Sequence, residues 1–498
     1  MIAPVTPADY FEYIRFDGGP CACVLSERGI SPASISQLFL WKAGEGPPRL
    51  LPGISLANQQ YSEREFTAAG ISFAGIRTGA FCCPDPWTGE MIPATDVLTS
   101  RVQSSLPFGI LPLFYRHWSP KGGVFWACVY GTYGRVTQLI IPAMNCVIYE
   151  LWEHRARAVV TTLSETLALE GVRSKIEGRA EPMVAGAKRV GLLDMVTNFG
   201  HQLLNHLSGL QRLIDLDIGQ RLDEIWVCGA EFFGPTEALF PEFEGRIKRV
   251  QSRWTVLEKL LREPCHVFKV GSNVATQPLR ARVRRRGRSG PGDGFLRLVV
   301  TVRAEGRRCL NLPEAVAELY NSLLPEYPNL RIVLDGWVFP HSEVVAASSV
   351  ATAISDRFAG RMRVEMALAR AIVDRLPSGA AIANTIGRAL AESLDDLEGA
   401  HAYFAHVGTL QHKLGLLVGI PGVVHGPSSQ LRAPEGGPFS SQFGEPPTHL
   451  PPEAVEDVHA ASDRGPGFDD YRIVDTSWAV HGLRRMLQQA VEHGSALQ

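Results

Sequence analysis

The sequence predicts an α/β protein with two Rossmann-like halves, a strand-rich N-terminal region and a C-terminal helix. Three observations predict this fold class. From about residue 151 onward, short apolar runs of strand length alternate with stretches of helical periodicity. Six arginines in the nine residues 280–288, followed by Ser-Gly-Pro-Gly-Asp-Gly, interrupt the alternation near its middle. The alternation then resumes, and repeated strand–helix–strand units imply a parallel sheet on each side of the break.

Composition and charge are those of an ordinary globular chain. Of the 498 residues, 45% are apolar and 20% are charged, which suits a protein of two or three domains. The formal net charge of −2 gives no general electrostatic reason to expect a nucleic-acid partner. Residues 1–18 carry several charges, and no run of about 18 uncharged apolar residues occurs, so we expect neither a secretory signal nor a spanning helix. The nine cysteines lack paired C-x-x-C spacing, which favours free thiols in the reducing cytoplasm.

The N-terminal region, residues 1–150, is rich in glycine, proline and aromatic residues. Its short apolar runs, such as 124–130 and 138–141, lie between turn signals and predict strands. The pattern changes over 151–171, where Glu, Ala, Leu and Arg predominate and predict a helix. We therefore place the end of this region at residue 150. Whether this region recognises an acceptor substrate or mediates assembly stays open.

Residues 151–285 are predicted to form the first Rossmann-like half. Apolar runs predict strands at 189–196, 224–228 and 266–270, and helical periodicity marks 199–214 and 256–261. The arginine-rich stretch 280–288 ends this half, and we interpret it as a solvated linker. Contact with an anionic acceptor, or peripheral contact with a membrane surface, is the alternative for this stretch.

Residues 286–430 repeat the pattern and form the predicted second half. Its predicted strands are 295–302, 330–334, 380–383, 402–405 and 423–424, and its predicted helices are 312–324, 350–358, 366–375, 386–394 and 409–418. The remaining residues, 431–498, belong to a loop and a terminal helix. Pro, Gly and Ser predict the loop over 426–467, and periodicity predicts the helix over 477–492. Doubly wound sheets bind ligands at the carboxyl ends of their strands, which directs attention to those ends.

The most informative segment is residues 403–414, Tyr-Phe-Ala-His-Val-Gly-Thr-Leu-Gln-His-Lys-Leu, where a strand leads through a glycine turn into a helix. A helix N-terminus offers N–H groups and partial positive charge, which suit a pyrophosphate. Gly408 permits close backbone approach, and Thr409 either caps the helix or donates to a phosphate oxygen. His412 and Lys413 add charge near the first turn. A simple strand–turn–helix with a threonine cap is the alternative.

A second segment, residues 194–204, also leaves a strand and opens a helix. His201 lies in the first turn, where an imidazole with a pKa near neutrality can act as a general base on an acceptor hydroxyl. Asn205, Ser208 and Arg212 follow at helical spacing and extend the polar face. The alternative is a structural histidine that bonds a backbone group.

Arginines follow the first strand of the second half, within residues 301–308. Arg303 and Arg308 are candidates for gripping phosphates with their forked donors, and ordinary surface ion pairs are the alternative. Asp335, at the end of the next predicted strand, can accept from a ribose or sugar hydroxyl, although Asp-Gly is also a common turn pair. The D-x-D pattern at 215–217 follows a helix rather than a strand, so a metal site there is not favoured. No P-loop, G-x-S-x-G, H-E-x-x-H or strand-linked G-x-G-x-x-G is present.

Taken together, these segments resemble the family 61 glycosyltransferases. Members carry a motif of the kind N-F/Y-x-H-W-L-x-D, and residues 198–206 here read Asn-Phe-Gly-His-Gln-Leu-Leu-Asn-His. Members also carry H-G-A-G-L before a helix, and residues 406–410 read His-Val-Gly-Thr-Leu. Gln202 and Asn205 replace the tryptophan and the acidic residue, and residues 407–409 also depart from the motif. The resemblance covers roughly residues 188–426.

The resemblance implies a GT-B fold, a nucleotide-sugar donor held mainly by the second half, and no obligatory metal or other cofactor. It adds His406 and Leu410 to the expected donor contacts, and Asn198 and Asn205 to the expected acceptor contacts around His201. The sequence therefore predicts sugar transfer to a glycan, lipid-linked or protein acceptor. An inverting course is expected, and a retaining one stays open.

Two rival functions stay open at this point. An epimerase acting on a nucleotide sugar would need carboxylates that face the sugar, and Glu231 is its candidate. A non-catalytic protein that binds a nucleotide or glycan is the other rival.

Overall fold

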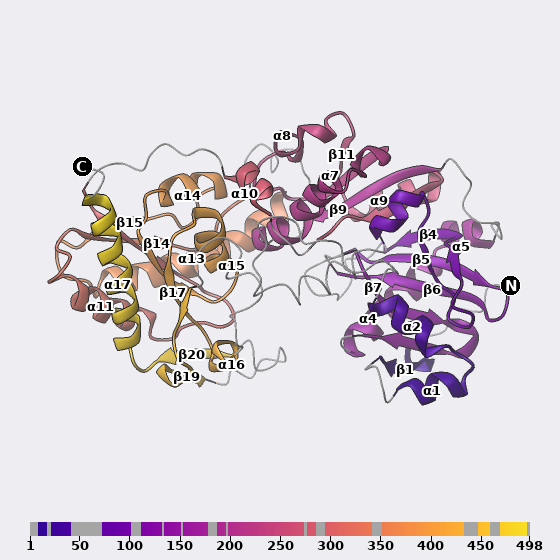
Figure 1. Cartoon of the computed structure of the whole chain (residues 1–498), viewed down its shortest axis with the longest axis horizontal. Coiled ribbons are helices and arrows are strands. Elements are labelled where there is room, and N and C mark those ends of the chain that lie inside the picture. Colours follow the sequence, from indigo (N-terminus) through magenta and orange to yellow (C-terminus); the bar gives the residue numbers. More distant parts are fainter. Residues whose placement is uncertain are drawn as a thin grey trace. The chain divides into compact units, whose positions relative to one another are not determined.

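The computed structural model of the chain describes residues 8–16, 21–40, 72–100, 111–131, 134–150, 153–177, 187–195, 198–272, 276–284, 294–340, 351–432, 447–458 and 469–495. These residues fall into two compact units. The first unit holds the described residues up to Ala230 together with Thr236–Thr276, and the second holds Glu231–Pro235 and the described residues from Gln277 onward. Both units are α/β, and each contains a parallel sheet of the Rossmann type (Figure 1). The predicted fold class is therefore confirmed.

The N-terminal part of the first unit is built on a six-stranded mixed sheet of order β1-β8-β7-β6-β5-β4. Its strands are β1 (Glu12–Arg15), β4 (Asp96–Thr99), β5 (Leu113–Ser119), β6 (Gly123–Val129), β7 (Val136–Ile141) and β8 (Cys146–Tyr149). The pair β1–β8 is parallel and the other neighbours are antiparallel. Strands β7 and β8 are buried along their whole length. These strands confirm the predicted strand-rich region.

Helices and a small hairpin accompany this sheet. They are α1 (Cys21–Glu27), α2 (Pro32–Leu40), the hairpin β2 (Cys82–Pro84) and β3 (Met91–Pro93), α4 (Glu153–Leu167) and α5 (Glu170–Glu177). Apolar residues of α4 such as Val160 and Leu163 pack in one core cluster with Trp126 and Ile140 of the sheet. The predicted helix over 151–171 thus corresponds mainly to α4. The apolar stripe of this helix covers the sheet.

The same unit contains a four-stranded parallel sheet of order β11-β10-β9-β12. Its elements are β9 (Lys188–Met195), β10 (Glu224–Gly229), β11 (Ile247–Val250), β12 (Cys265–Lys269), α8 (Thr236–Leu239) and α9 (Arg253–Arg262). After β9 the chain forms a continuous helix of three parts. These parts are α6 (Phe199–His201), a π-helical segment (Gln202–Leu207) and α7 (Ser208–Asp215).

Several contacts join the sheets of the first unit, and two of them show how. Leu257 of α9 belongs to the core cluster of the six-stranded sheet. The Tyr115 hydroxyl of β5 donates to the Val267 carbonyl of β12 at 2.6 Å. The predicted strands β9, β10 and β12 are confirmed. Strand β11 was not predicted, because its exposed Lys248 and Arg249 interrupt the apolar run.

The second unit is built on a six-stranded parallel sheet of order β15-β14-β13-β16-β17-β18. Numbered along the chain, this is the order 3-2-1-4-5-6 of a doubly wound sheet. Its strands are β13 (Leu296–Thr301), β14 (Leu330–Asp335), β15 (Ala381–Asn384), β16 (Ala402–His406), β17 (Gly422–His425) and β18 (Thr448–His449). Its helices are α10 (Gln277–Val283), α11 (Leu312–Leu323), α13 (Ala351–Val373), α14 (Leu390–Leu397), α15 (Thr409–His412), α16 (Ser428–Leu431) and α17 (Ser477–Ser495).

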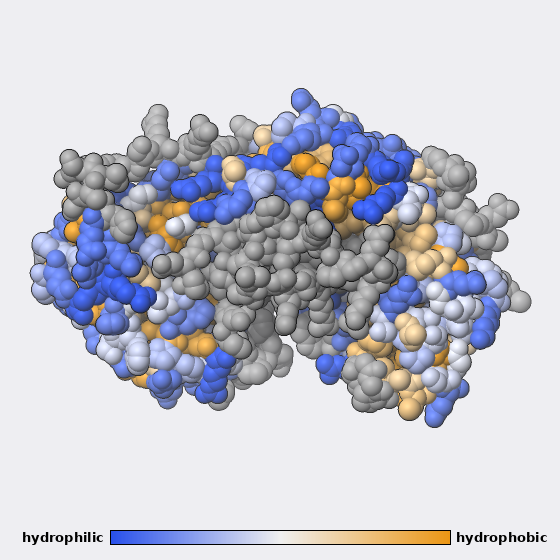
Figure 2. Space-filling view, viewed as in Figure 1, coloured by the Kyte–Doolittle hydropathy of each residue, from blue (hydrophilic) through white to orange (hydrophobic). Residues whose placement is uncertain are grey.

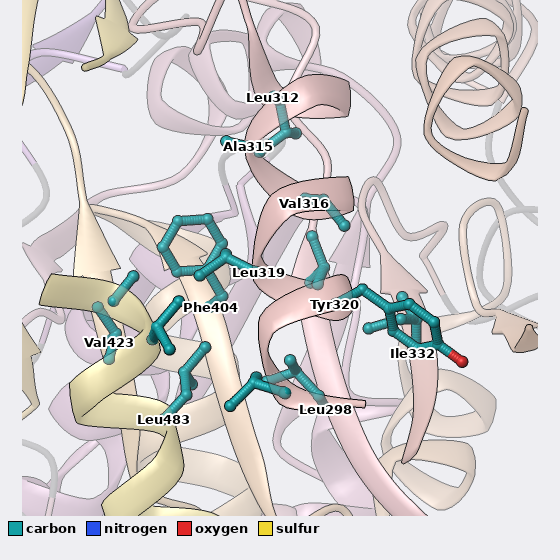
Figure 3. Packing of buried hydrophobic residues seen from close by; sticks show 14 of the residues in the cluster. Leu298, Leu312, Ala315, Val316, Leu319, Tyr320, Ile332, Phe404, Val423 and Leu483 are labelled. Carbon is teal, nitrogen blue, oxygen red and sulfur yellow. The ribbon is translucent and has the colours of Figure 1, made fainter. Parts of the chain in front are cut away.

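Helices cover both faces of this sheet, which explains why its central strands read as largely apolar runs. Leu298 of β13 belongs to a core cluster with Leu319 of α11 and Leu483 of α17 (Figure 3). Val299, the next residue, belongs to a separate cluster with Leu397 of α14. Side chains of one strand alternate between faces, so the two clusters lie on opposite sides of the sheet.

Three predictions about the second unit need correction. The predicted helices 350–358 and 366–375 are one helix, α13, because Gly360 is accommodated within it. Arg280 and Arg282 lie on α10 and not in a linker, whereas 285–293 lie outside the described residues. The described parts of 426–467 are not only loop, because they include α16, β18 and β19 (Val455–Val458), which pairs with β20 (Asp470–Ile473).

The coloured residues on the face in Figure 2 are mainly hydrophilic, with apolar areas between them. Among the residues that the structure describes, no helix combines the length and the apolar character needed to cross a bilayer.

Candidate functional site

The residues predicted to bind a phosphate follow two neighbouring strands of the second unit, β13 and β16. The chain leaves β13 toward β14 on one side, while β16 pairs with β13 on the other side. Connections that diverge in this way leave a crevice at the carboxyl ends of the two strands, where doubly wound sheets bind their ligands. Arg303 lies just beyond the end of β13, and Gly408 lies just beyond the end of β16. Both residues therefore belong to this switch point.

Gly408 forms the turn that leads into α15. Its φ of 118° is a conformation that residues with a side chain rarely adopt. A Cβ atom built on Gly408 would lie 3.6 Å from both terminal nitrogens of Arg307 and 3.8 Å from Nη1 of Arg303. The two guanidinium groups thus converge on the position that a side chain at residue 408 would occupy. Thr409, the first residue of α15, is half-buried beside this turn.

Arg303 and Arg307 are half-buried and have oxygen acceptors that carry no charge. Arg303 Nε donates to the main-chain oxygens of Glu305, at 2.9 Å, and Gly306, at 2.8 Å. Arg307 Nη1 donates to Gln430 Oε1 at 3.0 Å. Burial lowers the pKa of Arg303. Burial, and then the charge of Arg303, lower the pKa of Arg307 to about 10. An anion between the two groups would relieve both effects.

Arg307 was not among the predicted contacts, whereas Arg308 was. Arg308 Nη2 lies 2.5 Å from Asp470 Oδ2, its Nε lies 3.0 Å from the same oxygen, and its main-chain N–H bonds Oδ1 at 2.8 Å. Burial by itself would raise the pKa of Asp470, but the hydrogen bonds from Arg308 hold it below its usual value. Arg308 thus ties the turn to β20, and contact of its side chain with a ligand stays a prediction.

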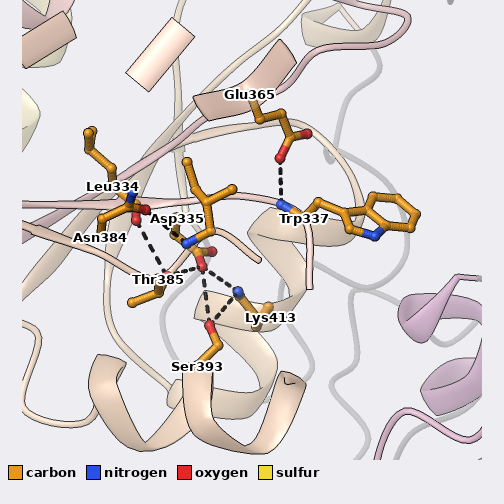
Figure 4. Close-up of polar contacts among 9 residues, drawn as sticks. Leu334, Asp335, Trp337, Glu365, Asn384, Thr385, Ser393 and Lys413 are labelled. Atoms are coloured by element: carbon orange, nitrogen blue, oxygen red, sulfur yellow. Dashed lines mark hydrogen bonds and ion pairs between the residues drawn. The ribbon is translucent and has the colours of Figure 1, made fainter. Parts of the chain in front are cut away.

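Lys413 and Asp335, both predicted to bind the donor, are each other's partners. Lys413 Nζ lies 2.5 Å from Asp335 Oδ1, and both side chains are fully buried. Thr385 Oγ1 donates to the same oxygen at 2.7 Å, and Ser393 Oγ accepts from Lys413 at 3.1 Å (Figure 4). This network fastens the helix after Gly408 to the end of β14. In this arrangement the charge of Lys413 is paired with that of Asp335 within the unit. Contact with a ligand stays a prediction for both residues.

His406 lies beneath the arginine pair and is 2% exposed. Thr301 Oγ1 accepts from its main-chain N–H at 2.8 Å and lies 3.0 Å from its Nδ1. The ring centre is 4.4 Å from that of His425, whose Nδ1 lies 2.6 Å from the Tyr471 hydroxyl. Burial, followed by the charges of His425, Arg303 and Arg307, holds the pKa of His406 well below its usual value. His406 is therefore neutral and supports the turn from within.

The two other predicted contacts on this helix are less informative. Leu410 is buried and His412 is half-buried. Their contact with a ligand stays a prediction.

The candidate base, His201, lies at the carboxyl end of β9 in the first unit. Asn198 caps its helix, because Oδ1 accepts from the N–H groups of Gly200 at 2.9 Å and His201 at 3.3 Å. His201 Nδ1 lies 2.9 Å from Asn205 Oδ1, and Asn205 Nδ2 donates to the Ser272 carbonyl at 3.1 Å. Asn198 and Asn205, predicted to bind the acceptor, thus position His201, and their contact with an acceptor stays a prediction.

These hydrogen bonds select one tautomer of His201. A carbonyl can only accept, so the Ser272 contact identifies the donor end of the Asn205 amide and turns its oxygen toward the imidazole. Nδ1 of His201 then carries the proton, and Nε2 is the nitrogen that takes one up. Burial lowers the pKa of His201, with the Asn205 bond opposing. The imidazole is therefore neutral near neutral pH, as a general base must be.

The weaker candidates are less well placed. Glu231, the candidate of the epimerase hypothesis, is 2% exposed. Asp215 of the D-x-D pattern accepts from Gln211 at the end of α7. Within the described ranges, no three His, Cys, Asp or Glu side chains are grouped so that they could hold a metal ion.

No protein family matches the chain, and no curated protein matches it. Among solved structures, the chain is similar to a family 9 glycosyl transferase from Veillonella parvula, with 9% identity, a TM-score of 0.32, and coverage of 62% of this chain and 99% of the other. It is also similar to the dodecameric iron-containing heptosyltransferase TibC, solved with ADP-D-beta-D-heptose, with 12% identity, a TM-score of 0.34, and coverage of 78% and 97%. These similarities carry no argument about function, and membership of family 61 stays a prediction.

Proposed function

We propose that this protein is a glycosyltransferase that moves a sugar from a nucleotide-activated donor to a hydroxyl group of a glycan, lipid-linked or protein acceptor. The observation that carries the proposal is the convergence of Arg303 and Arg307 on Gly408 at the switch point of a doubly wound sheet. Burial lowers the pKa values of both half-buried guanidinium groups, and such a pair suits a ligand with more than one negative charge. A diphosphate has that charge, and its oxygens match the forked donors of arginine.

The second part of the proposal concerns His201. In the reaction, Nε2 takes the proton from the acceptor hydroxyl, and the acceptor oxygen forms a bond to the anomeric carbon of the sugar. The bond between that carbon and the donor phosphate breaks, and the nucleoside diphosphate leaves with the electron pair. Arg303 and Arg307 stabilise the negative charge that develops on the leaving group. A single direct displacement by the acceptor oxygen, assisted by one base, inverts the configuration at the anomeric carbon.

The remaining predicted contacts enter this proposal in supporting places. Thr409 donates to a phosphate oxygen, and Gly408 allows the phosphate to approach the backbone. Asp335 and Lys413 hold the helix behind the phosphate, and Asn205 holds the base. The proposed chemistry uses no metal and no further cofactor.

The test begins with thermal unfolding of the purified protein in the presence of nucleoside diphosphates, CMP and common nucleotide sugars, without added metal. A ligand at about 100 times its dissociation constant adds about 2.7 kcal/mol to the free energy of unfolding. We expect one nucleotide class to stabilise the wild-type protein and to lose its effect in Arg303→Ala and Arg307→Ala. Failure of every nucleotide to stabilise the wild-type protein would overturn the proposal.

A second measurement separates the three functions. With the nucleotide identified, His201→Ala should retain nucleotide binding and lose about 10²–10⁴-fold in transfer rate to an acceptor. Turnover of the nucleotide sugar without any acceptor would instead favour the epimerase. A His201→Ala variant with unchanged function would favour the non-catalytic binding protein.

A further inference from the structure

A buried carboxylate, that of Glu365, joins the turns that follow β13 and β14. Glu365 lies on α13 and is 5% exposed. Its Oε2 accepts from the main-chain N–H of Trp337 at 2.6 Å (Figure 4), and its carboxylate also accepts from the main-chain N–H of Ala304. Trp337 follows β14 and Ala304 follows β13. One side chain of the crossover helix thus holds both turns.

The turn after β14 leaves room for this carboxylate. A Cβ atom built on Gly336 would lie 2.5 Å from Oε2 of Glu365, closer than non-bonded atoms approach. The φ of Gly336 lies outside the left-handed region, so the backbone itself does not require glycine there. The same Cβ atom would lie 3.1 Å from Cγ1 of Ile386 and 3.3 Å from the Val302 carbonyl oxygen, so the carboxylate is the nearest of three atoms that favour glycine here.

A second side chain of α13 holds the same two turns. Arg361, one helical turn before Glu365, forms an ion pair with Glu305 on the turn after β13. Its guanidinium also lies over the Trp337 ring, 4.7 Å from the ring centre. The turn between β13 and α11 carries Arg303 and Arg307. It is thus attached to α13 at two residues one helical turn apart.

The surroundings of Glu365 are both apolar and charged. The groups that face it are Asp335 at the end of β14, Arg303 on the turn after β13, and the two main-chain N–H groups. Burial raises its pKa to about 7, the two N–H groups oppose the rise, Asp335 adds to it and Arg303 opposes it. The carboxylate therefore changes its charge near neutral pH.

We propose that Glu365 is a positioning residue of the anion site, which holds the turn carrying Arg303 and Arg307 in place over Gly408. This inference rests on the proposed function, because the anion is the diphosphate assigned to the two arginines. Removal of the carboxylate frees the N–H groups of Ala304 and Trp337 and lets the turn move. If Glu365 acted through its charge alone, its removal would strengthen anion binding, because loss of a negative charge beside Arg303 favours an anion. If it acts by holding the turn, its removal weakens anion binding.

The test measures binding of inorganic pyrophosphate by titration calorimetry at about pH 8.5. We compare wild type, Glu365→Gln, Gly336→Ala and the control Glu318→Gln, which changes an exposed glutamate on α11 of the same unit. We expect both Glu365→Gln and Gly336→Ala to weaken binding about tenfold or more, the loss of roughly one charge-assisted hydrogen bond. Gly336→Ala keeps the negative charge, and its methyl group meets the carboxylate first, so it distinguishes position from charge. Glu318→Gln should bind as wild type does.

The pH dependence gives an independent readout. Sulfate keeps its charge between about pH 5.5 and 8.5, so it serves as the probe. Wild-type affinity for sulfate should fall as the pH is lowered through about 7, and the affinity of Glu365→Gln should stay flat over that range.

The outcomes separate this inference from the proposed function. Pyrophosphate binding by Glu365→Gln that equals or exceeds that of wild type overturns the inference alone. Undiminished binding by Gly336→Ala overturns it as well, even if Glu365→Gln fails to fold. Absence of pyrophosphate binding by the wild-type protein overturns the inference and the proposed function together.

Discussion

Arg307 and Arg308 are adjacent in the sequence and have different partners in the structure. Arg307 faces the Gly408 turn, and Arg308 pairs with Asp470. We predict that Arg307→Ala weakens binding of the nucleoside diphosphate by about 10- to 100-fold, since hydrogen bonds to charged groups contribute roughly 1.5–3 kcal/mol. Arg308→Ala should change binding much less and lower the free energy of unfolding by about 1 kcal/mol. Calorimetry and urea unfolding of both variants test the pair, and an equal loss of affinity in both would refute the assignment.

Asn205 determines which nitrogen of His201 accepts the proton. We predict that Asn205→Ala lowers kcat by about tenfold or more, a part of the roughly 10²–10⁴-fold that a general base contributes, with unchanged nucleotide affinity. Asn205→Asp places a negative charge beside the imidazole, which raises the pKa of His201. The acidic limb of its kcat/KM profile should therefore move to higher pH than in wild type. A profile that does not move would argue against His201 as the base.

At the scale of elements, the two units share an irregular feature. The helix after β9 and the helix after β16 both begin with a short α-helical turn and continue as a π-helical segment of six residues, Gln202–Leu207 and Lys413–Val418. A π-helix bonds i to i+5 and has a wider turn, so it changes which residues share a face. Asn205 and Lys413, which hold the two candidate sites, both lie in these segments.

The Lys413–Asp335 pair makes the second of these segments testable. Lys413→Met leaves a buried carboxylate without its ion-pair partner and should lower the free energy of unfolding by about 3–5 kcal/mol. Adding Asp335→Asn removes the uncompensated charge, so the double variant should be more stable than Lys413→Met alone. Urea unfolding of both single variants and the double variant gives the coupling energy. Additive effects of the two substitutions would show that the pair does not interact.

For the whole molecule, buried histidines predict a dependence of stability on pH. Burial lowers the pKa values of His117, His206 and His425 to about 3, from an ordinary value of 6.5. Between these values the unfolded chain binds more protons than the folded one. Their contribution is thus fully present above about pH 6.5 and decreases as the pH falls, by up to about 1.4 kcal/mol per pH unit for each histidine.

Urea unfolding between about pH 7.5 and 5 measures this slope. In His206→Gln the slope should be smaller by up to about 1.4 kcal/mol per pH unit below about pH 6.5. His481→Gln, which replaces an exposed histidine of α17, should leave the slope unchanged. A slope that does not respond to His206→Gln would show that this histidine is protonated in the folded protein.

Much of the molecule could be predicted from its sequence, and the parts that could not have physical reasons. Strands β13 and β16 are buried on both faces and so read as apolar runs, which placed the turns at Arg303 and Gly408 correctly. The choice between Arg307 and Arg308 depends on positive φ angles at Gly306 and Arg307, which spacing does not reveal. The inward direction of Lys413 was missed because helical spacing assumes an α-helix, and its segment is a π-helix. The edge strand β11 was not predicted, because the exposed Lys248 and Arg249 interrupt its apolar pattern.

The pairing of the arginine turn with β20 has a consequence for the order of events during synthesis. Arg308 and Asp470 are 162 positions apart, and the main chain of Leu310 bonds that of Tyr471. At about 5–20 residues per second, a ribosome needs roughly 8–30 s to extend the chain from the turn to its anchor. During that interval the nascent second unit has Arg303 and Arg307 on a turn without this anchor. We therefore expect the growing chain to acquire its anion site late, after most of the parallel sheet has been made.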